Sequence, residues 1–505
     1  MPTSNVTKIL DDLKIEFFAD ANLRRYAKVP VGKTRKILPL ESQQFSEYIR
    51  RAVYQSDGTV LAEHKLKELV SLFSAKASYD GDARRVYIRT APIDHADPLK
   101  GIEIDLGDED GQCVRITADE FTVCQPSVEF LRPSNYLTLP IPAPGGDIRR
   151  IFDYVNVEGD SNQIALITFL IASLYPTGPY PMLVLTGQEG SGKSVATELI
   201  AKTIDPRTGT QRSMPQSERD IAIAAMRAHL LTYDNLSDLK WDVSDTLCRI
   251  STGATIEVRK LYSDADVFEM TFMKPLLLNS IIDLVSRPDL AQRTFILELT
   301  PITPSKRRLR SELEKTFADD SAHIFGGICR ALHTAMAEYR KTKVLMPPRM
   351  ADAAKIAAAA SSSFNSTPNE VVKALNEVQN NQKKVLASED AVCRAIKAFL
   401  RSQIWEGDAT TLYGELTQQV NSALTPRPPN WPKDVATFSK HLKRQHENLK
   451  GIGIIVTNSR DSDGRKIKLE REAVKPTAAV QIYARTSVSA CDSMTAMTAD
   501  WDDLP

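Results

Sequence analysis

The chain has 505 residues, of which 42% are apolar and 25% are charged, and its formal net charge is zero. This length allows two to four domains with hydrophobic cores, and the composition is typical of a globular protein. A net charge of zero excludes a chain-wide attraction to nucleic acid or membranes, so any such affinity has to come from local patches.

The cysteines and the N-terminal residues favour a reduced, cytoplasmic protein. The six cysteines are scattered without a CxxC pair, which argues against a zinc site and against a disulfide framework. Residues 1–14 lack the charged-then-apolar pattern of a signal peptide. The most apolar helical stretch, residues 164–175, is too short to cross a bilayer. We therefore expect no contact with a membrane.

Residues 1–150 predict a mixed α+β domain whose role is open. Helical spacing of apolar residues over 43–73 is followed by four β-prone segments, at 85–89, 101–106, 113–117 and 120–123. Four acids lie in or just after the second of these segments: Glu103, Asp105, Asp108 and Asp110. Because they fall on a strand end and a Gly-containing turn, we expect them to be solvated rather than metal-bound. A Pro-rich stretch at 139–146 marks the domain boundary.

Residues 151–300 alternate between helical and β-prone segments, which predicts an α/β core: a parallel sheet with helices on both faces. Helices are expected at 163–175 and 195–203, and strands at 182–186, 229–234 and 274–280. Residues 301–387 read as a helical lid and linker, with an amphipathic helix over 312–339 and an Ala-rich one over 349–360.

A Gly-rich loop between the first strand and its helix carries the most specific signal. It has the form GxxxxGKS, in which glycines let backbone N–H groups face phosphate oxygens, the Lys reaches the β- and γ-phosphates and the Ser hydroxyl binds magnesium. The positive end of the following helix dipole favours the same anion. The sequence therefore predicts a site for ATP and Mg²⁺. Its residues are Gly187, Gln188, Glu189, Gly190, Ser191, Gly192, Lys193 and Ser194, followed by Val195.

The second strand of the core, an apolar run from His229, ends in a carboxylate at Asp234. Such a carboxylate can hold magnesium together with Ser194; an acid that merely ends a strand is the alternative. Asn235 follows, at a place where a Glu that polarises the attacking water is usual. An amide can orient water but cannot accept its proton, so the sequence predicts ATP binding and leaves the hydrolysis rate open.

Polar residues after the third strand complete the candidate catalytic set. Asn279 can bond the γ-phosphate or the attacking water; an Asn that starts a turn is the alternative. Arg287 and Arg293 follow. An Arg presented to the ATP of a neighbouring subunit stabilises transition-state charge, and we favour Arg293 over Arg287 for this role. A solvated or salt-bridged Arg remains the alternative for either. An Arg acting in this way implies a homo-oligomer.

Between the second and third strands, residues 254–272 consist of two β-prone runs around a turn sequence, which predicts a hairpin. Arg259 and Lys260 lie near its tip. One interpretation is an ordinary surface hairpin with solvated charges. The other is a hairpin that projects into a central channel and grips a nucleic-acid backbone through these two cations.

Residues 388–475 predict a small separate domain of helices and a hairpin, similar to a winged helix. Residues 433–472 hold ten Lys/Arg against six Asp/Glu, so this part is locally basic. Phosphates or bases of duplex DNA would meet its third helix and its wing; a protein contact or plain solvation is the alternative. The candidate DNA contacts are Lys440, Lys443, Arg444, Arg465 and Lys466. Residues 476–505 are low in large apolar side chains and predict a disordered tail.

With these motifs in order, the chain resembles AAA+ ATPases of the branch that carries a hairpin before the third motif strand, as in superfamily-three and MCM-like helicases. More narrowly, it is similar to the replication-type ATPases of phages, prophages and mobile islands. The stretches that carry the resemblance are GPYPMLVLTGQEGSGKS, YDNLSDL, SDTLCRISTG, VRKLY, LLLNSI and RPDLAQR. The chain departs from the family pattern at Gln292, where an acid is usual, and in the order of Gln188 and Glu189.

The resemblance implies an ATPase that assembles as a ring, with a hexamer as the expected number, and that threads and unwinds DNA during replication of a phage or mobile element. A single strand would lie in the ring channel and duplex DNA at the winged helix. Two alternatives stay open. One is an ATP-switched initiator or loader that binds DNA with slow hydrolysis, which Asn235 favours. The other is a regulatory or defence ATPase that does not unwind DNA.

Overall fold

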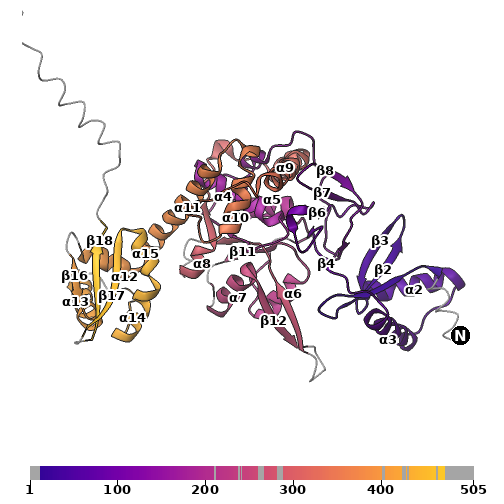
Figure 1. Cartoon of the computed structure of the whole chain (residues 1–505), viewed down its shortest axis with the longest axis horizontal. Coiled ribbons are helices and arrows are strands. Elements are labelled where there is room, and N and C mark those ends of the chain that lie inside the picture. The colour runs from indigo at the N-terminus through magenta and orange to yellow at the C-terminus, as the bar shows by residue number, and fades with distance from the viewer. Residues whose placement is uncertain are drawn as a thin grey trace, which may run out of the picture. The chain divides into compact units, whose positions relative to one another are not determined.

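The structure, a computed structural model, describes residues 12–209, 212–236, 239, 241–259, 267–280, 288–400, 404–422, 428, 431–461 and 464–472. The chain divides into two compact units, residues 1–386 and residues 387–505 (Figure 1). Among the described helices, none is long and apolar enough to cross a membrane. The tail predicted for residues 476–505 lies outside the described residues.

The first part of unit 1 is a three-stranded antiparallel sheet covered by two helices. The sheet has the order β1 (Glu16–Ala19), β2 (Arg25–Val31) and β3 (Thr34–Pro39), and the helices are α2 (Gln43–Asp57) and α3 (Glu63–Tyr79). Phe45, Ile49 and Phe73 are fully or almost fully buried in their shared core. The helical spacing predicted over 43–73 is divided between two helices, because Gly58 adopts a left-handed φ of 71° and ends α2.

A second antiparallel sheet belongs to the main core of unit 1. Its order is β5 (Thr90–Pro92), β6 (Ile102–Asp105), β7 (Cys113–Ile116) and β8 (Phe121–Cys124), beside the short parallel pair β4 (Val86–Tyr87) and β9 (Glu129–Phe130). Ile104 and Val114 are buried in the same hydrophobic cluster as residues of the long helices α4 (Asp160–Leu174) and α9 (Arg310–Glu338). This sheet is therefore packed directly on the α/β part of the chain.

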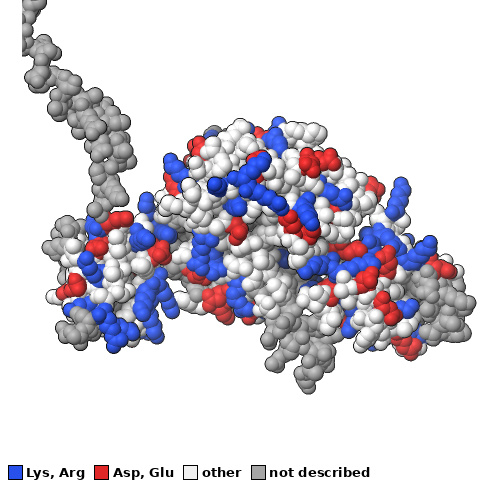
Figure 2. All heavy atoms as spheres, in the orientation of Figure 1, with Lys and Arg blue, Asp and Glu red and all other residues white. Residues whose placement is uncertain are grey.

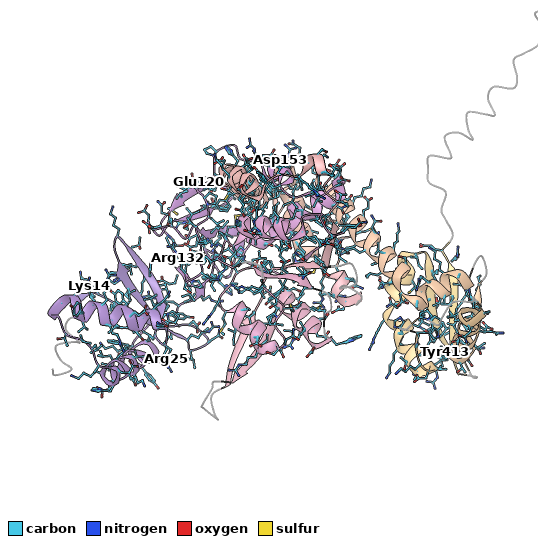
Figure 3. The ribbon with its side chains drawn as sticks, turned by 180° about the vertical axis from the view of Figure 1, so that it is seen from behind. Lys14, Arg25, Glu120, Arg132, Asp153 and Tyr413 are labelled. Carbon is cyan, nitrogen blue, oxygen red and sulfur yellow. The ribbon has the colours of Figure 1, made fainter. Side chains whose placement is uncertain are left out.

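The expectation that the acids of β6 are solvated is wrong. Glu103 and Asp105 have no exposed surface, and each is paired with an arginine. Arg115, the cross-strand neighbour of Glu103, lies 2.7 Å from it, and the Nε of Arg132 donates to Asp105 at 3.0 Å. Arg132 is labelled in Figure 3. Among the described residues no group of three His, Cys, Asp or Glu side chains is arranged to hold a metal ion.

The α/β core is built on a four-stranded, all-parallel sheet. Its order is β11 (Leu231–Leu236), β14 (Leu276–Ser280), β10 (Met182–Thr186) and β15 (Thr294–Glu298). Alternate residues of β10 point to opposite faces, and both faces are covered. Leu183 and Leu185 join the cluster that contains α4, α5 (Lys193–Ile204) and α9, whereas Met182 and Val184 join the cluster on the other face. Burial on both faces explains the continuous apolar runs of these strands.

Further helices and one hairpin complete unit 1. The helices are α6 (Glu218–Ala225), α7 (Trp241–Thr252), α8 (Pro288–Gln292), α10 (Ala351–Ala359), α11 (Pro368–Glu389) and the short 3₁₀ turns η1 (Pro98–Lys100), η2 (Ile148–Asp153), η4 (Pro304–Lys306) and η5 (Ser361–Phe364). The predicted hairpin is confirmed as β12 (Ala254–Arg259) and β13 (Val267–Phe272), which pair antiparallel and extend away from the parallel sheet (Figure 1).

The described residues of unit 2 form four helices and a three-stranded antiparallel sheet. In chain order it contains α12 (Ala391–Phe399), β16 (Trp405–Gly407), α13 (Ala409–Ser422), α14 (Val435–Arg444), α15 (His446–Gly451), β17 (Ile454–Asp461) and β18 (Gly464–Arg471). The sheet order is β16-β18-β17. Tyr413, labelled in Figure 3, donates to the carbonyl of Pro432 at 2.8 Å and packs against Phe438. The predicted third helix of this domain is divided at Gln445 into α14 and α15.

Candidate nucleotide site at the carboxyl edge of the parallel sheet

The loop between β10 and α5 has a backbone that three glycines make possible. Gly187, Gly190 and Gly192 have φ values of 143°, 82° and 81°, which side chains with a Cβ rarely adopt. At Gly187 space is also lacking, because a Cβ would lie 2.6 Å from the carbonyl oxygen of Leu299. The glycine spacing of the sequence motif is thus explained by local backbone geometry and by a close neighbour.

Lys193 lies across this loop at the first position of α5. Its ammonium donates to the carbonyls of Gly187 at 2.7 Å and Gln188 at 3.1 Å. No side chain caps the start of α5, so its first N–H groups and the positive end of its dipole are turned to the loop. Ser191 is 1% exposed and its hydroxyl has no partner among the described residues. These are the features of a cradle for an anion.

Three polar side chains converge beside the loop from three different elements. The hydroxyl of Ser194, on α5, lies 3.3 Å from Oδ1 of Asp234 and 3.4 Å from the amide nitrogen of Asn279. The same amide nitrogen donates to Asp234. Because β14 lies between β10 and β11, Asn279 occupies the central position. The structure thus brings together three residues that sequence motifs singled out separately.

A β-bulge turns Asp234 towards this cluster. The pairing of β11 with β14 shifts register between Tyr233 and Leu236, and Asn235 within the bulge has a left-handed φ of 54°. Its backbone N–H donates to the side-chain oxygen of Asn279 at 3.0 Å, while its own side chain is exposed. Asn tolerates this conformation better than most residues, because its short polar side chain can bond locally.

These donors fit a magnesium ion and a triphosphate. Mg²⁺ prefers oxygen ligands and keeps several waters, so one hydroxyl and one carboxylate, as in Ser194 and Asp234, suit it. The loop supplies backbone N–H groups and Lys193 for the phosphates. Gln188, Glu189 and Gly190 form its exposed tip, and Val195 continues α5 behind it.

One further arginine lies at the loop, and the sequence motifs did not reveal it. The segment after β15 covers the loop: the Leu299 N–H donates to the carbonyl of Thr186 at 2.8 Å, and Ile302 lies against Gly192. At the end of this segment, Nη2 of Arg307 lies 4.0 Å from where a Cβ on Gly190 would be. Arg307 is exposed and makes no ion pair or side-chain hydrogen bond with the described residues. The basic run from Lys306 to Arg310 was the available signal.

Arg293 lies at the opposite edge of the sheet from the loop. Its carbonyl accepts from the N–H of Met182, the first residue of β10, whereas the loop follows Thr186, the last. Four residues of strand separate these edges by roughly 13 Å. The Arg293 guanidinium donates to Thr252 Oγ1 at 2.9 Å and lies 3.4 Å from Asp289. Arg293 is therefore not brought to the loop of its own subunit.

The second arginine candidate, Arg287, lies outside the described residues. Arg349, from the segment before α10, pairs with Asp289 at 2.9 Å and donates to Gln292. Asp289 thus holds two arginines, Arg293 and Arg349, at the amino edge of the sheet. Of the two cations predicted near the hairpin tip, Arg259 is the last residue of β12, and the structure does not describe its side chain. Lys260 lies outside the described residues.

A buried ionic cluster fixes the far end of the loop helix. Asp205, directly after α5, lies 3.0 Å from Nε of Arg89 and 2.7 Å from Nε of Arg207, and all three are buried. The same carboxylate accepts from the backbone N–H of His229 at 2.9 Å. Since Arg89 precedes β5, the cluster connects the second antiparallel sheet to α5 and to the start of β11.

The cluster shifts the titration of its members. Burial raises the pKa of Asp205, but the positive charges of Arg207 and Arg89 outweigh it and hold the pKa below its usual range. Burial lowers the pKa of His229 to about 4, and the positive charge of Lys274 acts in the same direction. Burial also lowers the pKa of Lys274 to about 8. The imidazole is therefore neutral in the folded protein at pH 7.

The cations predicted to contact DNA lie on α14 and β18 of unit 2. Lys440, Lys443 and Arg444 are exposed on α14. Arg465 is exposed and Lys466 half-buried near the start of β18. Lys and Arg side chains gather on the end of unit 2 that carries α14 (Figure 2).

Comparisons with known proteins point to replication. Residues 148–376 match the model of the actinomycete integrative conjugative element replication protein, and residues 390–484 match the model of the C-terminal domain of that protein. The chain is thus similar, over most of both units, to a replication protein of a mobile element. No curated protein matches the chain.

Solved structures of the NrS-1 C-terminal region resemble the chain at low identity. An A-form apo structure is 12% identical to this chain, with a TM-score of 0.38. The match covers 92% of this chain and 98% of the chain in that structure. A second apo structure has 12% identity and a TM-score of 0.38, with coverages of 93% and 98%. A third has 10% identity and a TM-score of 0.39, with coverages of 93% and 99%. TM-scores of this size carry no argument about the activity of this chain.

Proposed function

We propose that the protein is an AAA+ ATPase that assembles as a ring and acts as a DNA motor in the replication of a mobile element. The observation that carries the proposal is the convergence of Ser194, Asp234 and Asn279 beside the Gly187–Ser194 loop. ATP would bind in the loop with Lys193 on its phosphates. Mg²⁺, held by Ser194 and Asp234, would neutralise charge on the phosphates.

Strand order supports the AAA+ assignment. Asn279 on β14 stands between the loop strand β10 and the acid-bearing strand β11, so its amide can reach both a γ-phosphate and the acid that holds the metal. Ligands of open parallel sheets bind at the carboxyl ends of the strands, which is where these groups meet. A hairpin between the acid strand and the Asn strand, β12–β13, fits the same assignment.

The place of Arg293 supports the proposal of a ring. An arginine at the amino edge of the sheet cannot contact ATP bound at the carboxyl edge of the same subunit. It can contact ATP of a neighbour when subunits pack edge to edge around a ring. In this proposal each site is completed by Arg293 of the next subunit, which stabilises charge in the transition state. A hexamer is the assembly that we expect.

DNA contact is assigned to two places. The β12–β13 hairpin, near whose tip the sequence predicts Arg259 and Lys260, would face a single strand in the ring channel. The helix and strand order of unit 2, with the sheet order β16-β18-β17, supports a winged helix, in which α14 and the start of β18 at Arg465 would meet duplex DNA. The match to a replication protein supports a role on DNA.

One experiment tests the motor directly. ATP hydrolysis by the purified chain is measured with and without DNA, displacement of a labelled strand from a fork is followed in parallel, and particles are imaged with ATP. DNA-stimulated hydrolysis with strand displacement and ring particles is the expected result. Hydrolysis without displacement, at any ratio of protein to fork, would contradict the motor.

A second candidate is an ATP-switched initiator or loader that binds duplex DNA and hydrolyses ATP slowly. The observation in its favour is Asn235, whose exposed amide stands where a water-polarising carboxylate is usual. Tight duplex binding that depends on ATP, without displacement of a strand, separates this candidate from the motor.

A further inference from the structure

A groove with an apolar floor runs along α14 of unit 2. It has a volume of about 340 Å³ and lies between α14 and the β17–β18 hairpin. Leu442, Val456 and Ile467 supply apolar surface, and each of them also belongs to the core of the unit. The volume falls within the range of pockets that accept small groups, roughly 300–1,000 Å³.

The rim of this groove carries two cations that have no acidic partner among the described residues. Lys443 and Arg465 line the groove and are exposed, and His446 lines it beside them. Lys468 of the same unit, by contrast, is paired and lies 2.7 Å from Glu470. An apolar floor beneath uncompensated cations favours an occupant that is both acidic and apolar.

The chain itself contains such a segment. Residues 500–504 read Asp-Trp-Asp-Asp-Leu, which places three carboxylates and two large apolar side chains within five residues. In residues 473–505 there is one other acid, Asp492, and no other tryptophan. The acidic groups complement the rim, and Trp501 and Leu504 complement the floor.

The connection is long enough. Arg465 and Ile467 of β18 line the groove, and β18 ends at Arg471, about 13 Å further along the strand. Residues 472–499 then lead to the acidic segment and span at most roughly 90 Å when fully extended. The segment can therefore return to the groove of its own unit without strain on the connection.

We propose that residues 500–504 of this chain bind in the groove between α14 and β17–β18, with Trp501 on the apolar floor and the aspartates beside Lys443 and Arg465. Both of these cations are candidate DNA contacts, so the acidic segment would compete with DNA for unit 2. That consequence rests on the proposed function, whereas binding of the segment to the groove does not.

The first test measures binding of the segment to the groove. A labelled peptide of residues 494–505 is titrated with the full chain in which Asp500, Asp502 and Asp503 are replaced by Asn and Trp501 by Ala, so that its own segment is inactive. Micromolar affinity is expected, weakened about tenfold or more by Lys443→Glu with Arg465→Glu. Lys397→Glu, an exposed cation of α12 outside the groove, is the matched control.

Absence of peptide binding, or equal loss with Lys397→Glu, overturns the proposal whether or not the protein binds DNA. The second test compares duplex affinity of the full chain with that of the chain carrying Asp500→Asn, Asp502→Asn and Asp503→Asn. Roughly three- to tenfold tighter DNA binding is expected, with Asp492→Asn unchanged. If the peptide binds the groove but the DNA affinity stays the same, competition is refuted. A change in oligomer mass would assign the groove to the segment of a second copy instead.

Discussion

The backbone N–H of Asn235 donates a hydrogen bond of 3.0 Å to Oδ1 of Asn279, although 44 residues separate the two in the sequence. The amide nitrogen of the same Asn279 side chain donates to Asp234. The Asn279 side-chain amide therefore accepts a hydrogen bond from Asn235 and donates one to Asp234. A carboxylate could only accept and an ammonium could only donate. The position of the candidate metal ligand is thus set by the neighbouring strand.

Asn279→Ala should separate hydrolysis from binding. The substitution leaves the Asp234 carboxylate without its amide donor and the Asn235 N–H without its acceptor at a position that is 2% exposed. ATP hydrolysis is expected to fall about 100-fold, while ATP affinity changes less than about fivefold. Calorimetry and a phosphate-release assay measure the two. Asn376→Ala on α11 is the control, and an equal loss in both variants would contradict a role for Asn279 at the site.

Lys193→Ala and Arg293→Ala should each stop ATP hydrolysis, for different reasons. A mixture of the two variants should recover part of the hydrolysis. The first removes the ammonium from the loop and abolishes ATP binding; the second leaves ATP binding intact. In a mixed ring, the ATP site of an Arg293→Ala subunit keeps its loop intact, and a neighbouring Lys193→Ala subunit can supply the missing Arg293. Hydrolysis is measured for each variant and for an equimolar mixture. If the mixture stays inactive although mass measurements show mixed assemblies, the arginine does not act between subunits.

Arg307→Ala should weaken binding of ATP more than binding of ADP. Its free guanidinium lies at the tip of the loop, close to Gly190, and would add positive charge beside the terminal phosphates. A loss of roughly five- to fiftyfold in ATP affinity is expected. Arg308→Ala is the matched control, because Arg308 is bonded to Thr316 instead. Equal effects of the two substitutions would indicate a general loss of positive charge rather than a contact.

Stability should fall as the pH falls from about 6.5 to about 4, because burial lowers the pKa of His229 from 6.5 to about 4. In this window the unfolded chain binds a proton at His229 that the folded chain does not, so the free energy of unfolding decreases by about 3 kcal/mol. Urea unfolding at a series of pH values measures the slope. His229→Gln should flatten it, and His64→Gln, at an exposed position, should not.

Lys440→Ala with Lys443→Ala should reduce the salt dependence of duplex binding. Each phosphate contact contributes about 0.9 to the slope of log Kobs against log salt, so losing two should lower the slope by roughly 1.8. Anisotropy titrations between low and moderate salt give the slope. Lys397→Ala on α12 should leave it unchanged. An unaltered slope in the double variant would rule out α14 as the DNA contact.

The residues of the candidate site were predictable where the signal is local. The loop glycines and Lys193 form a continuous motif, and Asp234 and Asn279 each end an apolar run that is typical of a buried strand. Parallel strands with helices between them bring such ends to one edge, so convergence follows from the pattern. The bulge at Asn235 did not show in the sequence, because its left-handed φ depends on the pairing of β11 with β14.

Contacts between segments that are far apart in the chain could not be predicted from the sequence. Arg307 meets the loop because the segment after β15 folds over it, and no spacing rule relates residue 307 to residue 190. Arg89 and Asp205 are 116 residues apart in the sequence, and their pairing depends on how two sheets pack. The pairing of Glu103 depends on strand register in the same way: in the structure, Arg115 lies directly opposite it on β7.

Strand β10 also has consequences for synthesis. Its two sheet partners are β14 and β15, which begin at Leu276 and Thr294, whereas β10 ends at Thr186. At translation rates of about 5–20 residues per second, the ribosome needs roughly 5–20 s to add the first of these partners. During that time the apolar run Met182–Leu185 has no strand beside it. The nascent chain therefore contains the whole Gly187–Ser194 loop well before it contains the sheet strands that pair with β10.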